Sequence, residues 1–214
     1  MKTARHLTIL ASLILIIIAC NPKIKNNLIE PAQQFTQVEK NLIMDQSYNS
    51  PMRVFQITDQ RDSLLLRSKS KLVIPDSTNL FLTRFISRLY STVIDSMSMG
   101  VGIAAPQVGI LKQIIWVQRF DKEAFPFEYY LNPKITHYSE LKQDCREGCL
   151  SIPDRSDTTR IRAQTIVMEH QLMDGNFVTD TIDGFTAVIF QHEIDHLHGI
   201  LYLDHLEKEV REGK

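Results

Sequence analysis

Two histidines and a glutamate form the strongest chemical pattern in the 214-residue chain. His192 and His196 are four residues apart and Glu193 follows the first of them, which gives the pattern H-E-x-x-H. On a helix, side chains four residues apart lie on one face, so both imidazoles could bind one metal ion. The glutamate of such a pattern handles the proton of a water molecule at the ion. The pattern predicts a mononuclear metal site that still needs a third ligand.

The alternative interpretation makes this segment an exposed polar helix face with ordinary surface histidines. The turn that precedes it is apolar, with Phe185, Val188 and Ile189. That apolar turn indicates partial burial, where two imidazoles without partners would be unfavourable, and so favours metal binding. His198 lies off the face shared by the two histidines and is expected at the surface. Asp195 and Gln191 are candidates for the hydrogen bonds that metal-bound histidines need.

Cys149 is the candidate third ligand. It lies in Glu-Gly-Cys-Leu-Ser at residues 147–151, 43 residues before His192 (192 minus 149). The adjacent Gly148 lets the backbone approach closely, as expected where a thiolate and main-chain donors meet at one ion. A buried apolar cysteine is the alternative, and it suits Cys145 better because no motif includes that residue. With the two histidines, Cys149 makes a three-ligand set that leaves one position for water.

A glycine-rich stretch at residues 100–109 reads Gly-Val-Gly-Ile-Ala-Ala-Pro-Gln-Val-Gly. A tight turn between a helix and a strand would explain its glycines, and Gly-x-Gly says little about phosphate binding when no helix follows. Gln107 is the side chain that could do chemistry here. An amide on a loop stiffened by Pro106, placed beside a metal ion, can donate a hydrogen bond to a developing oxyanion.

The elements that must position these residues predict an α+β domain. Apolar residues recur at three- and four-residue steps over 78–97, which predicts a helix that starts at residues 76–78 and ends at Gly100. Residues 113–117 predict a buried strand. A second strand is expected over 129–135, where Pro133 indicates an edge or irregular position.

The C-terminal half predicts a hairpin followed by the helix that carries the histidines. Apolar and polar residues roughly alternate over 160–172 and again over 177–182, with a Met-Asp-Gly-Asn turn at 173–176 between them. After Gly184 the spacing of apolar residues changes from that of a strand to that of a helix, and Gly199 is expected to end this helix. Strands before and after one helix with the polar cluster support the α+β class.

Three of these stretches resemble, in order, the signature motifs of the peptide deformylase family. They are residues 100–109, Glu-Gly-Cys-Leu-Ser at 147–151, and Gln-His-Glu-x-x-His at 191–196. The resemblance extends from about residue 76 to residue 206. It implies an α+β fold in which strands surround a central metal-binding helix. It also implies one divalent ion, with Fe(II) expected and Zn(II), Ni(II) or cobalt able to occupy the same site.

The resemblance further implies roles for individual residues in removing the N-formyl group from N-formylmethionyl peptides or proteins. Cys149, His192 and His196 would bind the metal. Gln107 and the backbone amide of Leu150 would stabilise the tetrahedral oxyanion, and Glu193 would move the proton from water to the leaving amine. Formate and a free N-terminus would result.

Substrate contacts are implied at five positions that match the family: Val101, Gly102, Phe185, Val188 and Ile189. Ordinary core packing is the alternative for these apolar side chains. After Pro153 the sequence is more polar than the family pattern. Arg160 is therefore left open as a partner of Glu147.

Two other functions compete with deformylation. An H-E-x-x-H metallopeptidase would cleave internal amide bonds, but such enzymes complete the site with a ligand downstream of the motif, whereas Cys149 lies upstream. A catalytically inactive lipoprotein with the deformylase fold is the second alternative. The intact set of ligands, with Glu193 and Gln107, favours an enzyme.

The N-terminus has the order of a secretory signal. Positively charged Lys2 and Arg5 precede an apolar run over 7–19, which is short for a membrane span. Its end at Cys20 resembles a lipobox and predicts a signal peptide over 1–19, cleavage before Cys20 and a lipid anchor on its thiol. A buried apolar helix or strand is the alternative.

Downstream of the signal, residues 20–50 are polar and are interpreted as a tether, followed by a catalytic domain over 51–214. Localisation is expected at the membrane on the extracytoplasmic side, or in the cytoplasm if the N-terminus is not processed. The 24 Lys and Arg residues balance 25 Asp and Glu without a one-sign stretch, so no nucleic-acid partner is expected. A peptide substrate and a monomer are expected.

Overall fold

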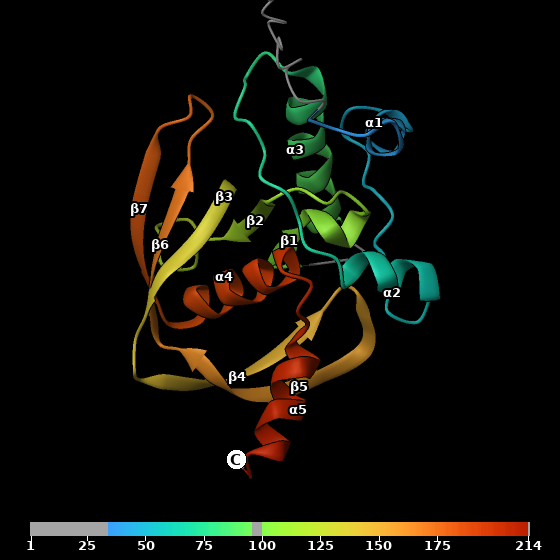
Figure 1. Cartoon of the computed structure of the whole chain (residues 1–214). Coiled ribbons are helices and arrows are strands. Elements are labelled where there is room, and N and C mark those ends of the chain that lie inside the picture. Colours follow the sequence, from blue (N-terminus) through green and yellow to red (C-terminus); the bar gives the residue numbers. More distant parts are fainter. Residues whose placement is uncertain (1–33, 96–99, 214) are drawn as a thin grey trace, which may run out of the picture. The chain divides into compact units, whose positions relative to one another are not determined.

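The computed structural model describes residues 34–95 and 100–213, and an antiparallel five-stranded sheet is their main element (Figure 1). Its strand order is β1-β2-β3-β6-β7, and β4 and β5 form a separate hairpin. The strands are β1 (Gly102–Ala104), β2 (Ile114–Gln118), β3 (Phe127–Tyr138), β4 (Lys142–Cys149), β5 (Ile152–Ala163), β6 (Thr165–Gln171) and β7 (Phe177–Asp183). The helices are α1 (Gln37–Met44), α2 (Gln60–Leu66), α3 (Leu80–Val93), α4 (Gly184–Leu197) and α5 (Tyr202–Arg211), with a 3₁₀ turn, η1, at Ala105–Val108.

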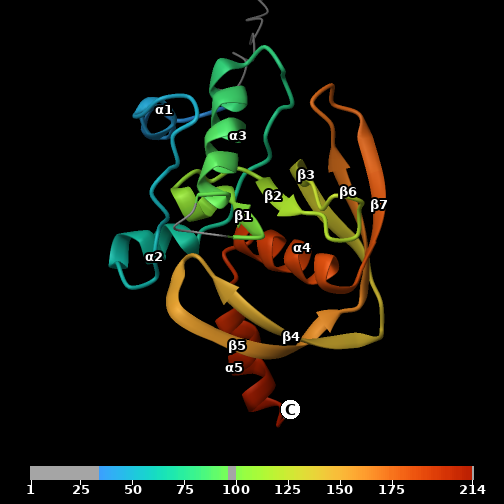
Figure 2. The ribbon, with the colours of Figure 1, turned by 180° about the vertical axis from the view of Figure 1, so that it is seen from behind.

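Helix α4 lies between the five-stranded sheet and the β4–β5 hairpin, as Figures 1 and 2 show from opposite sides. Its apolar side packs on the sheet in a cluster that includes Phe190 and Ile194 of the helix and Ile115, Met168 and Ile182 of the strands. Burial of these aliphatic and aromatic side chains stabilises the arrangement by removing apolar surface from water. The expectation of an α+β fold with strands around a central helix is confirmed.

Helix α4 ends where the sequence predicted. Gly199 has a φ of 73°, a left-handed conformation that favours glycine. A Cβ at this position would also collide with the backbone carbonyl of Arg67. The chain therefore turns sharply after the histidines and continues into α5.

Helix α3 packs on the other face of the sheet. Its Phe85 and Leu89 share a buried cluster with Ile114 and Leu131, so neighbouring residues of β2 alternate between the two clusters. The helix begins later than predicted, because Asn79 caps it by accepting a hydrogen bond from the backbone N–H of Leu82 (3.1 Å). The helix also ends earlier than predicted: Val93 is its last residue and Ile94 its C-cap, so the expectation that Gly100 ends it is wrong. Residues 96–99 lie outside the described residues.

The predicted strands are present, with one difference at Pro133. The hairpin of β6 and β7 pairs in continuous register from Thr165 with Asp183 to Gln171 with Phe177, as the turn at 173–176 indicated. Pro133 lies in β3, which is an interior strand, and the pairing register shifts between Leu131 and Lys134. The prediction that Pro133 occupies an irregular position of a strand is therefore confirmed, and the alternative that it lies in an edge strand is wrong.

The hairpin of β4 and β5 was not predicted. Residues 142–149 read Lys-Gln-Asp-Cys-Arg-Glu-Gly-Cys, which has almost no apolar alternation. The alternating segment 160–172 is divided between the end of β5 and β6, with Gln164 between them. These two strands carry Cys149 and its neighbours to the side of α4 that faces away from the sheet.

The predicted tether over 20–50 is wrong for its described part, because residues 34–50 pack on the domain. Phe35 and Ile43 are fully buried in the cluster around α3. Thr36 and Glu39 form a reciprocal capping box that starts α1. The predicted signal peptide and Cys20 lie outside the described residues.

Arg88 of α3 holds the N-terminal segment in place. The residue is 2 % exposed, and its guanidinium donates to the carbonyl oxygens of Leu42 (2.7 Å), Ile43 (3.1 Å), Ser50 (3.0 Å) and Pro51 (3.3 Å). Replacing Arg88 with Met removes these four hydrogen bonds, one of them fully buried at the carbonyl of Ile43. The free energy of unfolding in urea is expected to fall by about 3 kcal/mol. Arg61→Met, at an exposed position of α2, is the matched control, and an equal loss in both variants would contradict this role of Arg88.

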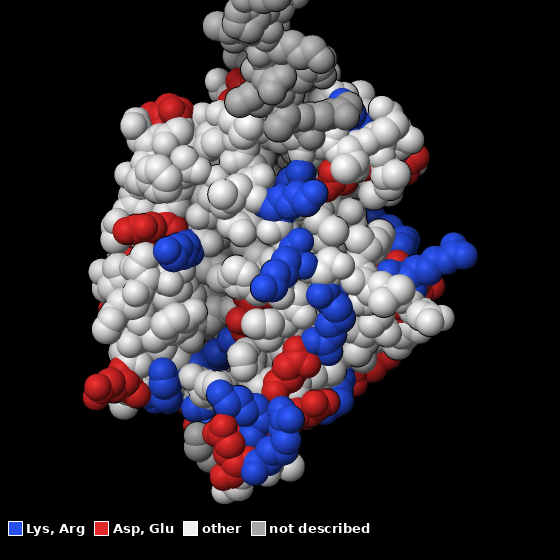
Figure 3. Space-filling view, viewed as in Figure 1, with Lys and Arg blue, Asp and Glu red and all other residues white. Residues whose placement is uncertain are grey.

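The surface carries charges of both signs. On the face shown in Figure 3, basic and acidic side chains are intermixed, most densely over α5 at the lower end. Within the described ranges, no helix has the length and apolar character needed to cross a membrane. The view agrees with the balanced charge of the sequence.

Candidate metal centre

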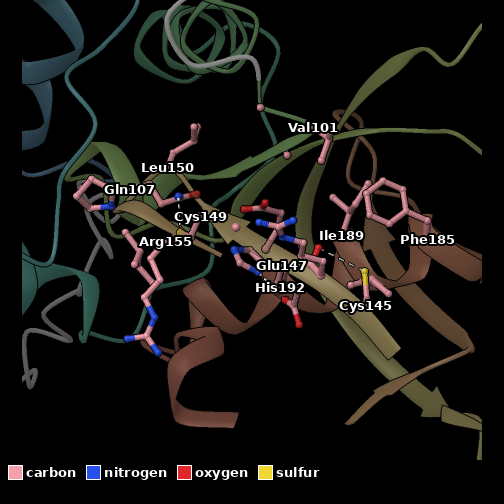
Figure 4. A pocket seen from close by; sticks show the side chains of 18 of the residues that line it. Val101, Gln107, Cys145, Glu147, Cys149, Leu150, Arg155, Phe185, Ile189 and His192 are labelled. Atoms are coloured by element: carbon pink, nitrogen blue, oxygen red, sulfur yellow. Dashed lines mark hydrogen bonds and ion pairs between the residues drawn. The ribbon is translucent and has the colours of Figure 1, made fainter. Parts of the chain in front are cut away.

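The three predicted ligands converge in the structure. Helix α4 presents His192 and His196 with ring centroids 5.0 Å apart. Cys149 lies at the end of β4, and Figure 4 shows it with His192 among the residues that line a cavity. The Cys149 Sγ is 3.2 Å from the Nε2 of His196. One donor atom from each of the three residues lies within 4.8 Å of the others. One thiolate and two imidazoles in this arrangement fit a divalent transition metal.

The protonation of the ligand set favours a thiolate. Burial raises the pKa of the Cys149 thiol, but the charges and hydrogen bonds of His196 and His192 outweigh burial and hold the pKa well below its usual value. Burial lowers the pKa of His192, while hydrogen bonds to Cys149 and Glu147 raise it well above its usual value. A metal ion requires the thiolate and a neutral imidazole, so metal uptake would release a proton from His192.

Glu147 fixes the orientation of His192. One carboxylate oxygen of Glu147 lies 2.8 Å from the Nδ1 of His192, which leaves the Nε2 of that ring for a metal. Arg162 donates to both Glu147 oxygens (2.9 and 2.8 Å), and Thr159 donates to one of them. Burial raises the Glu147 pKa, but His192 and Arg162 more than offset this effect and hold it well below its usual value.

Arg162, rather than Arg160, is the partner of Glu147. The register of β4 and β5 shifts between Gln143 paired with Arg162 and Cys145 paired with Thr159, so β5 has one extra residue there. This bulge reverses the alternation of side chains along β5. Arg160 consequently points to solvent, with its guanidinium 3.8 Å from an exposed carboxylate.

Glu193 is buried beside the ligands. It is 4 % exposed, and its Oε2 has no hydrogen-bond partner among the described residues. Burial raises the pKa of the Glu193 carboxyl to about 7, against the opposing charges of His192 and His196. A carboxyl with a pKa near neutrality and a free oxygen at a metal site is suited to accept and return a proton.

Gln107 has its amide orientation fixed by the backbone. Its Oε1 accepts a hydrogen bond from the N–H of Ala104 (2.8 Å), so its NH₂ group faces the site. That NH₂ group lies 3.6 Å from the Cys149 Sγ and 3.3 Å from the Ser151 Oγ. The structure thus aims a fixed donor at the side of Cys149, in the position that the predicted oxyanion role would need.

A cavity of about 460 Å³ opens beside the ligands. It is lined by the predicted residues Val101, Gly102, Gln107, Cys149, Leu150, Phe185, Val188, Ile189, His192 and Glu193. His196 is almost fully buried and is not part of the wall. Cys145, Arg146 and Arg155 also line the cavity and were not predicted. Figure 4 shows Cys145 among the side chains that line this cavity.

The remaining polar residues of α4 have structural hydrogen bonds. Gln191 binds both the N–H (2.9 Å) and the carbonyl of Ala163 (3.0 Å), which attaches the helix to the end of β5. Asp195 accepts a hydrogen bond from Arg162 (2.6 Å). His198 is exposed, as predicted. The sequence did not predict the contact of Arg162 with Glu147, because this contact depends on the β5 bulge and no sequence pattern indicates that bulge.

Gly102 leaves space for the side chains of Glu193 and Ile189. A Cβ at this position would lie 2.5 Å from the Oε1 of Glu193 and 2.8 Å from the Cγ2 of Ile189. Replacing Gly102 with Ala is expected to displace the Glu193 carboxylate and lower kcat/KM by roughly 100-fold, the size of effect that a 1 Å misplacement can cause. Steady-state kinetics with metal content measured on the same sample tests this. Unchanged kcat/KM would show that the carboxylate tolerates the added methyl group.

Comparisons with known proteins agree with this geometry. The family model described as "Polypeptide deformylase" matches residues 51–212. A peptide deformylase of Desulforudis audaxviator is 40 % identical over 155 residues, which cover 72 % of this chain and 94 % of that protein. The peptide deformylase 1 of Clostridium perfringens is 38 % identical over 147 residues, 67 % of this chain and 92 % of that protein.

Solved structures give the same result. A class I type b peptide deformylase of Acinetobacter baumannii superposes with a TM-score of 0.65 at 30 % identity, covering 72 % of this chain and 98 % of that one. The Thermotoga maritima peptide deformylase has a TM-score of 0.63 at 30 % identity, with coverage of 72 % and 97 %. The two alternatives, a metallopeptidase and a catalytically inactive lipoprotein with the same fold, are not favoured. The chain therefore belongs to the polypeptide deformylase family and has the activity of a peptide deformylase.

Proposed function

We propose that the chain hydrolyses the formyl amide of N-formylmethionyl peptides with one divalent cation held by Cys149, His192 and His196. The observation that carries this proposal is the convergence of these three donors with Glu193 and Gln107 on one cavity. The separated roles of these side chains match what amide hydrolysis needs: a polarised water, a proton carrier and an oxyanion donor.

The metal proposed for the site is Fe(II), with Zn(II) or Ni(II) as substitutes. One thiolate and two imidazoles suit each of these borderline ions. When bound, such a cation supplies Lewis acidity and lowers the pKa of a water molecule to roughly 7. The ligand orientation by Glu147 and the low thiol pKa of Cys149 support a preformed site.

The side chains around the site divide the chemistry. Glu193 takes a proton from the attacking water, whose oxygen bonds to the formyl carbon. The NH₂ of Gln107 and the backbone N–H of Leu150 donate to the oxyanion that develops on the formyl oxygen. The C–N bond then breaks, Glu193 returns the proton to the amine, and formate and a free N-terminus leave.

The cavity supports methionine as the first residue of the substrate. Val188 and Ile189 of α4 provide an apolar wall beside the ligands, and Phe185 stands at its more exposed end. A flexible thioether side chain packs well against such a surface. A structure of the Acinetobacter baumannii enzyme is described as Met-Ala-Ser bound, which supports a peptide of this kind.

The site of action is a separate proposal. The order of charged, apolar and small residues before Cys20 supports a lipidated form anchored to the extracytoplasmic side of a membrane. Membrane fractionation with mass analysis of the N-terminus tests it. A cytoplasmic protein with an intact N-terminus would refute the anchor and leave the enzymatic proposal unaffected.

Formate release tests the activity itself. Purified protein is incubated with formyl-Met-Ala-Ser, with acetyl-Met-Ala-Ser and with a peptide blocked at both ends. The expected result is one formate and one free amine per formyl peptide, and no cleavage of internal bonds. Activity should disappear with a chelator and return with Fe(II), Zn(II) or Ni(II). Cleavage of the blocked peptide would instead support a metallopeptidase.

A further inference from the structure

We infer that His205, on the C-terminal helix α5, is a positioning residue for His192. This inference rests on the proposed function, which makes His192 a metal ligand. A continuous series of hydrogen bonds connects the two histidines through Asp195, Arg162 and Glu147. The first ligand of the metal site is therefore held from an element that lies outside the cavity.

Arg162 is the centre of this series. One edge of its guanidinium donates to both oxygens of Glu147, at 2.9 and 2.8 Å, and its Nη1 donates to Asp195 at 2.6 Å. The Arg162 side chain is only 4 % exposed. A planar guanidinium with three short charge-assisted bonds fixes the positions of both carboxylates relative to each other.

The inner end of the series sets the direction of a ligand. The Glu147 carboxylate lies 2.8 Å from the Nδ1 of His192. With Nδ1 tied to a carboxylate, the direction of Nε2 follows the position of Glu147. A small rotation of the Arg162 and Glu147 pair would turn the imidazole away from the common point of the three ligands.

His205 is the last residue of this series of hydrogen bonds, at the end away from the cavity. Its Nε2 lies 2.7 Å from the Oδ2 of Asp195, the same oxygen that accepts the bond from Arg162. Because a carboxylate only accepts hydrogen bonds, the Nε2 of His205 must carry the proton. The Asp195 side chain is 19 % exposed, so without the imidazole it can rotate toward solvent and release one edge of Arg162.

Helix α5 has other attachments, so the effect of His205 can be separated from loss of the helix. Asp204 accepts from the N–H of Leu201 and forms an ion pair with Arg67. Tyr202 is buried with its ring centroid 6.1 Å from that of His192. A variant at position 205 should therefore keep α5 folded.

The test is the rate at which the metal-loaded protein releases Zn(II) to a chromophoric chelator. His205→Leu is expected to release Zn(II) roughly 10-fold faster, in the range typical of outer-sphere partners of metal ligands. The amide of His205→Gln can place a donor where Nε2 lies, so this variant should restore slow release. His137→Leu removes an exposed histidine of β3 and is the matched control.

A second measurement separates positioning from stability. The metal-free forms of His205→Leu and wild type should have the same Tm, while the rise in Tm caused by Zn(II) should be smaller in the variant. Equal release rates for His205→Leu and wild type would overturn the inference, as would an equal loss of Tm with and without metal. If His205→Leu does not fold, His205→Asn, whose amide is too short to reach Asp195, takes its place.

The two proposals fail in different ways. Wild-type protein that binds no metal, or whose metal is unaffected by changes at Cys149, would refute the proposed function and the inference with it. Wild-type protein that binds metal and releases formate, with unchanged release in the position-205 variants, would refute only the inference.

Discussion

Replacing Glu193 with Gln is expected to lower kcat for formate release by about 1,000-fold while the metal stays bound, within the range known for loss of general acid–base catalysis. Glutamine fills the same space next to Gly102 and Ile189 but cannot accept a proton. The three ligand atoms come from other residues, so the metal content should not change. Rate and metal content are measured on one preparation.

The matched control for this substitution is Glu169→Gln, at an exposed position of β6. It removes the same charge without touching the cavity and should leave kcat unchanged. Turnover by Glu193→Gln close to that of wild type would remove Glu193 from the role of proton carrier. Loss of metal from the same variant would show instead that the carboxylate supports the ligands.

The convergence of the candidate side chains could be predicted from the sequence because each part of that prediction depends on local patterns. The spacing of His192 and His196 on a helix determines that both face one side, whatever surrounds the helix. The glycines at 100 and 102 and the Pro-stiffened turn similarly place Gln107 beside β1. The structure adds how these three segments meet, with the β4–β5 hairpin bringing Cys149 against α4.

The contacts that sequence reasoning missed depend on register and on tertiary burial. Arg162 reaches Glu147 only because β5 contains one extra residue, and a bulge of this kind has no distinct composition in Thr-Thr-Arg-Ile-Arg. Likewise, the polar segment around α1 contains only two fully buried apolar side chains, Phe35 just before the helix and Ile43 within it. Two apolar residues are too few to indicate from the sequence that this segment packs on the domain. Its attachment comes from the buried guanidinium of Arg88, a cation that pattern analysis assigns to the surface.

The thiolate should be the ligand whose loss weakens metal binding most clearly. Replacing Cys149 with Ser is expected to weaken affinity for Zn(II) at least 100-fold, since even changes to the partners of ligands cost 10- to 100-fold. A neutral hydroxyl supplies neither the charge nor the polarisable sulfur, and it cannot form the thiolate that His196 and His192 stabilise. Competition titration with a chelator of known affinity measures the change.

Cys145→Ser gives the matched comparison, because it makes the same atom exchange in the wall of the same cavity. Cys145 lies on β4 two residues before Glu147 and is not among the three converging donors. Burial raises the pKa of its thiol, which favours the neutral form that does not bind metal. Affinity for Zn(II) should therefore be unchanged in Cys145→Ser. Equal weakening in both variants would mean that the general polarity of the cavity, rather than the Cys149 thiolate, determines metal binding.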